Sequence, residues 1–204
     1  MEDPQHSMED SSLKVVPFPH PTLRHKSKPI RRVDADLVRM VREMFTLMYS
    51  SNGIGLAANQ VDLPLRLFIV NLSAKANEGE ELVFINPVLS KPKGNEESEE
   101  GCLSFPELYG PVTRPKQITV QAYNLKGEEI RASLNGMLAR VVQHEYDHLD
   151  GVLFVDRMSL TARAQVQPTL NEFELSFRAL RQTGAMPDDA TIASRLAELE
   201  QRYT

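Results

Sequence analysis

The chain has 204 residues, of which 41% are hydrophobic and 25% are charged, proportions that are typical of one globular domain with a buried core. Its formal net charge of -5 argues against a nucleic-acid-binding surface, so we expect no DNA partner. No apolar run approaches the roughly 20 residues of a membrane-spanning helix, so we expect no membrane partner. The single cysteine leaves no intrachain disulfide, as in a reducing cytosol.

The N-terminal part has neither an apolar signal core nor the Arg-rich character of a transit peptide, which predicts a cytoplasmic location. Residues 1–13 are polar and lack periodicity, so we expect a mobile tail. From Asp34, a plausible N-cap, the pattern predicts a helix that ends before Gly53. Its buried face consists of Leu37, Val41, Met44 and Met48.

Short β-like runs separated by turn residues follow this helix. The runs are Leu67–Asn71, Leu82–Leu89, Gln117–Tyr123 and Glu129–Leu134. Residues 93–100 are rich in Glu and Ser, and we expect them to form a solvated connection.

A second helix is predicted from Asn135 to Leu149, with Gly151 just beyond its end. Its apolar stripe continues into His144, Glu145 and His148, and polar residues on a buried face indicate a functional site. After Ser159 the chain is helical again, and Thr169 with Glu172 has the spacing of a capping box. A final amphipathic segment carries Ile192, Leu196 and Leu199.

These elements predict an α+β fold with antiparallel sheets around a central metal-binding helix and helices at both ends. We expect the tail at 1–13, a catalytic domain at 14–160, and a C-terminal helical extension at 161–204 that packs on the same domain.

The second helix contains a candidate metal site. His144 and His148 are four residues apart, so both imidazoles project from one face and can hold one cation. Glu145 is placed to take a proton from a metal-bound water. A catalytic metal needs a third protein ligand, and Cys102 in a Gly-flanked turn is the candidate. These residues indicate a hydrolase, although two structural core histidines and a small buried cysteine are the alternative interpretation.

Three segments resemble the signature motifs of the peptide deformylases. Residues 53–60, Gly-Ile-Gly-Leu-Ala-Ala-Asn-Gln, resemble a G-x-G-x-A-A-x-Q stretch; residues 100–104 match E-G-C-L-S; and residues 143–151 match Q-H-E-x-D-H-L-x-G. The motifs occur in the order of the family, and the likeness runs from about Val15 to about Asp156.

The resemblance implies removal of the N-formyl group from N-terminal formyl-methionine of nascent polypeptides, with release of formate. It implies metal-bound water as the nucleophile, Glu145 as general acid and base, and one divalent ion. That ion is Fe2+ in the family, with Zn2+, Ni2+ or Co2+ as substitutes. It also implies that Gln60 and the amide of Leu103 bind the formyl oxygen.

The same resemblance implies a peptide that lies extended along Gly53, Ile54, Gly55 and Gly101. Its methionine side chain enters a pocket lined by Met137, Arg140, Val141 and His144. Arg140 stands where the best-known members have an aliphatic residue, and we expect its stem to line the pocket while its guanidinium reaches solvent. Tyr109 stands where many relatives carry an arginine at the pocket mouth.

The expected partners are N-formylmethionyl peptides and nascent chains, with a transient ribosome contact and a monomeric protein. From Ser159 onward there are five Arg and no Lys against four Glu and two Asp, which does not support a basic tail for docking on ribosomal RNA. Two rival functions are an H-E-x-x-H endopeptidase and a catalytically idle, metal-stabilised binding domain. The cysteine turn and the absence of a third histidine after His148 disfavour the first, and the filled Glu145 and Gln60 positions disfavour the second.

Overall fold

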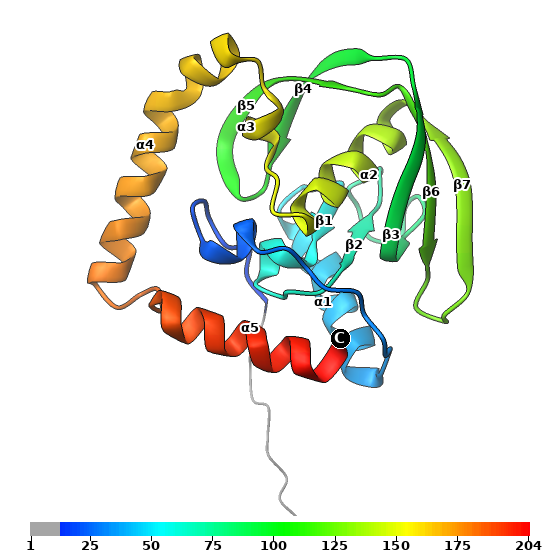
Figure 1. The fold of residues 1–204 in the computed structure, drawn as a ribbon, viewed down its shortest axis with the longest axis horizontal. Coiled ribbons are helices and arrows are strands. Elements are labelled where there is room, and N and C mark those ends of the chain that lie inside the picture. Colours follow the sequence, from blue (N-terminus) through cyan, green and yellow to red (C-terminus); the bar gives the residue numbers. More distant parts are fainter. Residues whose placement is uncertain (1–12) are drawn as a thin grey trace, which may run out of the picture.

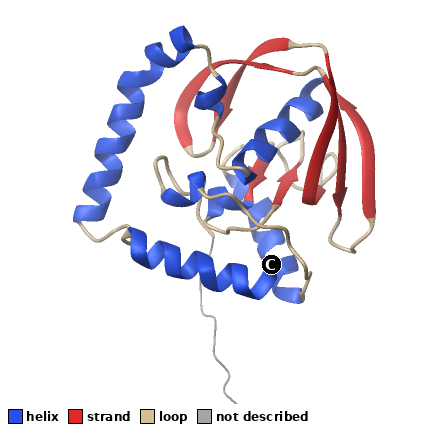
Figure 2. Ribbon diagram, viewed as in Figure 1, coloured by secondary structure: helices blue, strands red, loops and turns tan. Residues whose placement is uncertain are grey.

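Seven β-strands, five α-helices and two short 3-10 helices make up residues 13–204, the part of the chain that the computed structural model describes (Figures 1 and 2). The strands are β1 (Gly55–Ala57), β2 (Leu67–Val70), β3 (Leu82–Lys93), β4 (Glu96–Cys102), β5 (Phe105–Arg114), β6 (Gln117–Tyr123) and β7 (Glu129–Asn135). The α-helices are α1 (Ala35–Ser50), α2 (Gly136–Leu149), α3 (Phe154–Arg157), α4 (Leu160–Gln182) and α5 (Asp189–Tyr203), and the 3-10 helices are η1 (Pro21–Arg24) and η2 (Ala58–Val61). The predicted α+β class is confirmed.

The predicted mobile tail lies outside the described residues except for its last member, Leu13. Leu13 is partly buried and packs against a core cluster that contains the apolar face of α1. This apolar contact holds Leu13 against the core.

The strands form two antiparallel sheets. The larger sheet has the order β1-β2-β3-β6-β7, and β4 pairs with β5 in a separate two-stranded sheet. In this second sheet Cys102 pairs with Phe105 after an irregularity at Gly101, so a two-residue turn connects the strands. The candidate ligand Cys102 thus lies at the tip of a hairpin.

Helix α2 lies between the two sheets and is enclosed by strands in Figures 1 and 2. Its apolar residues Ala139, Val142 and Leu149 are buried in one cluster with Phe68 and Val120 of the large sheet. Burial of this face is what holds the helix, because each such side chain contributes about 1.5–3 kcal/mol when removed from water. The predicted helix at 135–149 is confirmed.

Helix α1 is also confirmed, with the N-cap that the sequence predicts. The side chain of Asp34 accepts a hydrogen bond from the backbone N–H of Leu37 at 2.9 Å. The four predicted apolar positions are buried in the core cluster that Leu13 joins.

Residues 93–100 are mostly exposed, as predicted, but the prediction that they form a connection is wrong because most of them belong to strands. Strand β3 continues to Lys93 and β4 begins at Glu96, with Gly94 between them at φ +61. Strand β5 was also absent from the predicted elements, although Phe105, Leu108 and Val112 are buried along it. The first half of β4 is exposed to solvent, so it carries no apolar alternation to indicate a strand.

The two C-terminal helices meet at a corner (Figure 1), with α4 on the side of β5 and α5 next to η1 and α1. Helix α4 begins at Leu160 with Ser159 as its N-cap, so the capping box predicted at Thr169 and Glu172 is wrong; both residues lie inside the helix, after Pro168. The stripe residues Leu170 and Phe177 of α4 are buried, as are Ile192 and Leu196 of α5.

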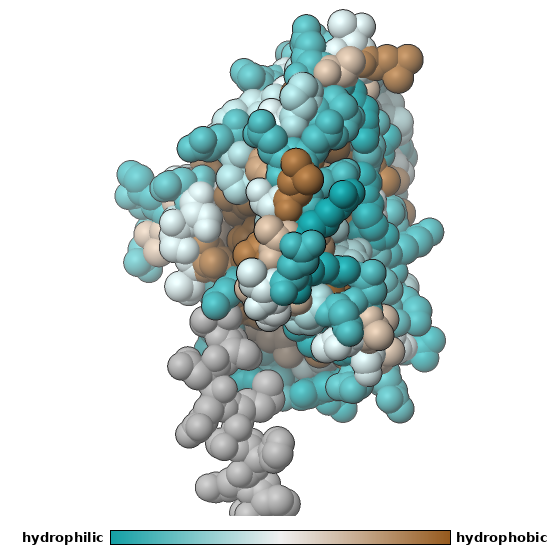
Figure 3. Space-filling view, turned by 90° about the vertical axis from the view of Figure 1, so that its left-hand side faces the viewer, coloured by the Kyte–Doolittle hydropathy of each residue, from teal (hydrophilic) through white to brown (hydrophobic). Residues whose placement is uncertain are grey.

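The face that carries α4 is mostly hydrophilic, with apolar side chains showing in small groups (Figure 3). Leu160 and Leu175 are the large apolar residues that α4 exposes most. Within residues 13–204 no helix combines the length and apolar character needed to cross a membrane.

Candidate active site

Helix α2 carries three of the predicted site residues on its buried side. His144, Glu145 and His148 all have little exposed surface, and His148 is almost fully enclosed. The helix ends at Leu149, and Gly151 follows with φ +71, a backbone conformation that favours glycine. A Cβ atom at Gly151 would lie 2.8 Å from the carbonyl carbon of Arg24, so the chain also needs glycine there for close packing.

The structure brings the three predicted ligands together. One ligand atom from each of Cys102, His144 and His148 lies within 4.8 Å of the others. The Cys102 Sγ atom is 3.4 Å from His148 Nε2, and these two atoms come from the β4–β5 hairpin and from α2. A thiolate and two imidazoles converging at this distance form a suitable donor set for one divalent ion.

Gln60, which belongs to η2, also contacts Cys102. Its side-chain oxygen accepts a hydrogen bond from the N–H of Ala57 at 2.8 Å, and its Nε2 donates to Cys102 Sγ at 3.3 Å. These two bonds fix the amide plane beside the thiol. Leu103 follows Cys102 directly in the hairpin turn, so its backbone N–H belongs to the same small region.

Glu145 is buried next to the ligands without a strong partner. Its Oε2 atom has no hydrogen-bond partner among residues 13–204. Burial is the main cause that raises the pKa of Glu145 to about 7, because a charged carboxylate is poorly solvated there. A carboxyl group with a pKa in this range can accept and release a proton near neutral pH.

Gly55 makes the room that Glu145 occupies. A Cβ atom at this position would lie 2.8 Å from Val141 Cγ1 and 2.9 Å from the carboxyl carbon of Glu145. The sequence suggested that this glycine lets a substrate approach the backbone. The structure gives it a second role, which is to let α2 pack closely on β1.

Glu100 holds His144 in place, a role that was not predicted from the sequence. Its Oε2 atom is 3.1 Å from His144 Nδ1, which leaves Nε2 of His144 for a metal. The neighbouring carboxylates of Asp147 and Asp150 bind arginines instead: Asp147 binds Arg114 and Arg157, and Asp150 binds Arg66. The sequence carried no clear signal for this contact, because it depends on how the β4–β5 hairpin docks on α2.

The charges around the ligands favour a cation. Burial lowers the pKa of His144, but contacts with Cys102 and Glu100 outweigh it and raise the value to about 10. For Glu100, burial raises the pKa, but His144 and Arg114 outweigh it and lower the value to about 2. Burial lowers the pKa of His148 well below its usual range, so its imidazole stays neutral and keeps a lone pair for a ligand bond.

Cys102, His144, Glu145 and Gln60 border one cavity of about 620 Å³, and His148 lies behind them without lining it. The cavity is lined by all the residues predicted to bind the peptide, which are Gly53, Ile54, Gly55, Gly101, Met137, Arg140 and Val141. It is also lined by Gln60, Cys102, Leu103, His144 and Glu145. Tyr109 also lines it, and its ring lies 2.6 Å from where a Cβ of Gly101 would be. The structure thus places the predicted residues around a single space, and their roles toward a substrate stay predictions.

The family model for polypeptide deformylase matches residues 12–164 of the chain. The chain is 50% identical over 192 residues to a peptide deformylase of Rhodopirellula baltica, covering 94% of this chain and 96% of that protein.

The chain belongs to the peptide deformylase family.

Other comparisons agree. Identity to the chloroplastic peptide deformylase 1B of Oryza sativa is 44% over 166 residues, which are 81% of this chain and 62% of that one. The crystal structure of a plant peptide deformylase is similar with a TM-score of 0.81 at 39% identity, covering 88% of this chain and 97% of that one. The peptide deformylase of Thermotoga maritima is similar with a TM-score of 0.69 at 38% identity, covering 74% and 99%.

The chain is therefore an enzyme that removes the N-formyl group from nascent peptides. Peptide deformylases depend on a metal, and the cluster of Cys102, His144 and His148 could bind one. The donor atoms fit such an ion, since the cluster joins a thiol to a neutral imidazole and to a second imidazole whose raised pKa shows attraction for positive charge.

Arg140 of this deformylase does not reach solvent, and the prediction that its guanidinium does is wrong. Its side chain is only 11% exposed. The guanidinium donates to Glu100 Oε1 at 2.7 Å and to the backbone carbonyls of Val112 and Glu96 at 3.0 and 2.7 Å. A carboxylate and two backbone carbonyls of the neighbouring hairpin accept from the guanidinium, so its charge is satisfied inside the protein.

Proposed function

We propose that this deformylase is a cytoplasmic iron enzyme in which Cys102, His144 and His148 hold one Fe2+ ion. Zn2+, Ni2+ and Co2+ could take its place, because the ligands alone do not select among these metals and availability decides. The observation that supports the site is the convergence of three donor atoms within 4.8 Å beside the unpaired carboxylate oxygen of Glu145.

In this proposal the bound ion supplies a Lewis acid that polarises the formyl carbonyl and activates a water for attack. Glu145 takes the proton of the attacking water and delivers it to the departing amine. Its raised pKa of about 7, caused mainly by burial, suits both steps. The neighbouring apolar residues exclude bulk water from the proton transfer.

Gln60 and the backbone N–H of Leu103 would stabilise the oxygen as it becomes negative. The amide nitrogen of Gln60 uses one N–H on Cys102 Sγ, which leaves its second N–H for the substrate. Donors that are already fixed before the reaction need no reorganisation, and one such donor is worth roughly 10²–10³-fold in rate.

The peptide would add to the sheet as an extended strand. Among residues 13–204, strand β1 is an edge of the large sheet and β4 pairs with β5 alone. Ile54, Gly55 and Gly101 line the cavity beside these two edges, so their backbone groups would pair with an added strand. Met137, Val141 and the stem of Arg140 would receive the methionine side chain, with Gly53 at the rim.

We further propose a monomer that contacts the ribosome transiently, since nascent chains are its substrates. In this view residues 14–160 form the catalytic domain, because all the proposed site residues lie between Gly53 and His148. Residues 161–204 are a helical extension packed on it, as the burial of Phe177, Leu196 and Tyr203 supports.

Replacement of Cys102 tests the metal site directly. Cys102→Ala should lose most of the bound metal and most of the formate release from a formyl-Met peptide, because two imidazoles alone hold the ion weakly. Metal content would be measured on anaerobically purified protein, since iron and thiolate both oxidise. Full metal occupancy in the alanine variant would contradict the ligand assignment.

A further inference from the structure

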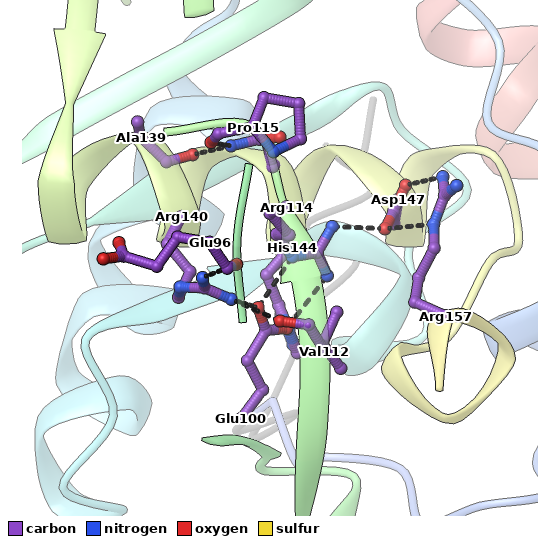
Figure 4. A network of polar contacts seen from close by, with 11 residues as sticks. Glu96, Glu100, Val112, Arg114, Pro115, Ala139, Arg140, His144, Asp147 and Arg157 are labelled. Atoms are coloured by element: carbon purple, nitrogen blue, oxygen red, sulfur yellow. Dashed lines mark hydrogen bonds and ion pairs between the residues drawn. The ribbon is translucent and has the colours of Figure 1, made fainter. Parts of the chain in front are cut away.

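Arg140 connects α2 to the hairpin that carries Cys102. It is four residues before His144, so both side chains leave the same face of the helix. All three acceptors of its guanidinium belong to the β4–β5 hairpin: the Glu100 carboxylate and the carbonyls of Glu96 and Val112. In Figure 4 the guanidinium lies between these groups, in the space between α2 and the hairpin.

Glu100 is the point where this connection meets a metal ligand. Its Oε1 atom accepts from Arg140 and from Arg114 Nε, both at 2.7 Å. Its Oε2 atom accepts from Arg114 at 2.9 Å and lies 3.1 Å from His144 Nδ1. Two arginines thus fix the carboxylate, and the carboxylate fixes the imidazole (Figure 4).

Arg140 also borders the cavity next to Met137 and Val141. One side chain therefore takes part in the cavity wall and in the support of His144. We propose that Arg140 is a positioning residue that acts through Glu100 to fix the orientation of His144 and thereby retain the metal, an inference that rests on the metal site proposed above. A ligand imidazole whose other nitrogen is held in this way typically gains about 10–100-fold in metal affinity.

Without the Arg140 guanidinium, Glu100 keeps its two bonds to Arg114 and its contact with His144, but loses one of its donors from α2. The carbonyls of Glu96 and Val112 lose their link to the helix at the same time. The Arg114–Asp147 pair still joins the hairpin to α2, but with fewer bonds between them the two elements can shift slightly, which moves Cys102 relative to His144. Metal release should become faster because the ligands come from these two elements.

The chain offers a matched control in Arg66. Its side chain is 13% exposed, against 11% for Arg140, and it also binds the end region of α2. It donates to Asp150 at 2.9 Å and lies over the ring of Tyr146, without contact to Glu100 or to a ligand side chain. Arg66→Leu therefore reports the cost of removing a buried arginine from this helix.

The experiment loads anaerobic protein with Co2+ and follows its transfer to a chromophoric chelator. Arg140→Leu should release Co2+ faster than the wild type, by up to about 10–100-fold, the loss that follows removal of a direct partner of a ligand imidazole, with a changed visible spectrum of the Co2+–thiolate centre. Arg140→Lys keeps the charge but lacks the planar fork that reaches three acceptors, so its release rate should lie between the two. Arg66→Leu should release Co2+ within about twofold of the wild type.

Other results overturn the inference in distinguishable ways. Wild-type release rates in Arg140→Lys and Arg140→Leu would show that Arg114 alone positions Glu100, and the lysine variant decides if the leucine variant does not fold. Equal acceleration in Arg66→Leu would assign the effect to general loosening of α2. Failure of the wild type to bind Co2+ would instead contradict the metal site itself.

Discussion

Glu145 is buried as deeply as the two histidines beside it, but its Oε2 atom has no hydrogen-bond partner in residues 13–204. Leaving a buried carboxylate oxygen unpaired costs free energy, so such a group indicates a function that uses it. The glycine at position 55 allows this arrangement, since a larger residue would collide with the carboxyl group.

The role of Glu145 is tested by Glu145→Gln, which keeps the shape and removes the base. Turnover should fall by roughly 10²–10⁴-fold, and the metal content should stay at the wild-type level because Glu145 is not a ligand. Formate release and metal content are measured on the same sample. Activity within about tenfold of the wild type would mean that another group moves the proton.

At the scale of residues, spacing and the single cysteine could indicate the proposed metal ligands. His144 and His148 share a helix face, and Cys102 is the one cysteine of the chain. The support of His144 by Glu100 could not be predicted in the same way, because it depends on how a hairpin 44 residues earlier docks on α2. The predicted position of the Arg140 guanidinium was wrong for the same reason, because a long side chain turns toward the acceptors that the tertiary structure brings near.

At the scale of elements, α1 and α2 were predictable because their apolar residues recur at helical spacing and become the buried face. The β4–β5 hairpin was not, because Glu96–Glu99 are largely exposed and lack the alternation of a half-buried strand. The start of α4 was misplaced because Thr169 and Glu172 match a capping pattern, whereas Ser159 is the residue that caps the helix.

The contact between the N-terminal segment and α4 contains a buried histidine. His20 Nδ1 accepts from the N–H of Thr22 at 3.3 Å, and its ring meets that of Phe177 edge-on. Burial is the main cause that lowers the pKa of His20 to about 4, and Arg195 and Arg181 add to it, while Asp189 opposes it. The folded protein therefore keeps His20 neutral where an unfolded chain would protonate it.

This difference predicts a pH-dependent stability. Because the pKa of His20 is lower in the folded state, the unfolded state binds a proton at a higher pH than the folded state does. The free energy of unfolding should therefore be highest above pH 6.5 and should decrease as the pH falls from 6.5 toward 4. In His20→Asn the amide oxygen can replace Nδ1 as acceptor without titrating. The wild type should lose stability relative to this variant over that pH range in denaturant titrations, and parallel curves would contradict the prediction.

At the scale of the whole molecule, helix α5 packs against α1 and the segment before it, residues 25–31. Tyr203 of α5 is buried in the same core cluster as α1, and its carbonyl accepts from the N–H of Arg31 at 2.8 Å. Glu200, one turn earlier, binds His25 and Lys28 at 2.8 and 2.7 Å. The C-terminal helix therefore contributes to the core and is more than a surface addition.

Tyr203→Ala should consequently destabilise the protein by about 3–5 kcal/mol, as for other large aromatic residues removed from a core. At roughly 2–4 °C per kcal/mol for a chain of this size, the Tm should fall by about 10 °C. Tyr203→Phe keeps the ring and should lose only about 0.5–1.5 kcal/mol through its bond to Asp34. Equal Tm values for the alanine variant and the wild type would show that α5 does not stabilise the core.

We propose that one divalent ion held by Cys102, His144 and His148 makes this chain an active deformylase. The most direct measurement is an anaerobic titration of metal-stripped protein with Fe2+, with formate release from a formyl-Met peptide recorded at each addition. We predict that activity is absent at the start, rises linearly and reaches its plateau at about one ion per chain, as a single site with three protein ligands requires. Full activity in the stripped protein, or a plateau reached only at two or more ions per chain, would contradict the account.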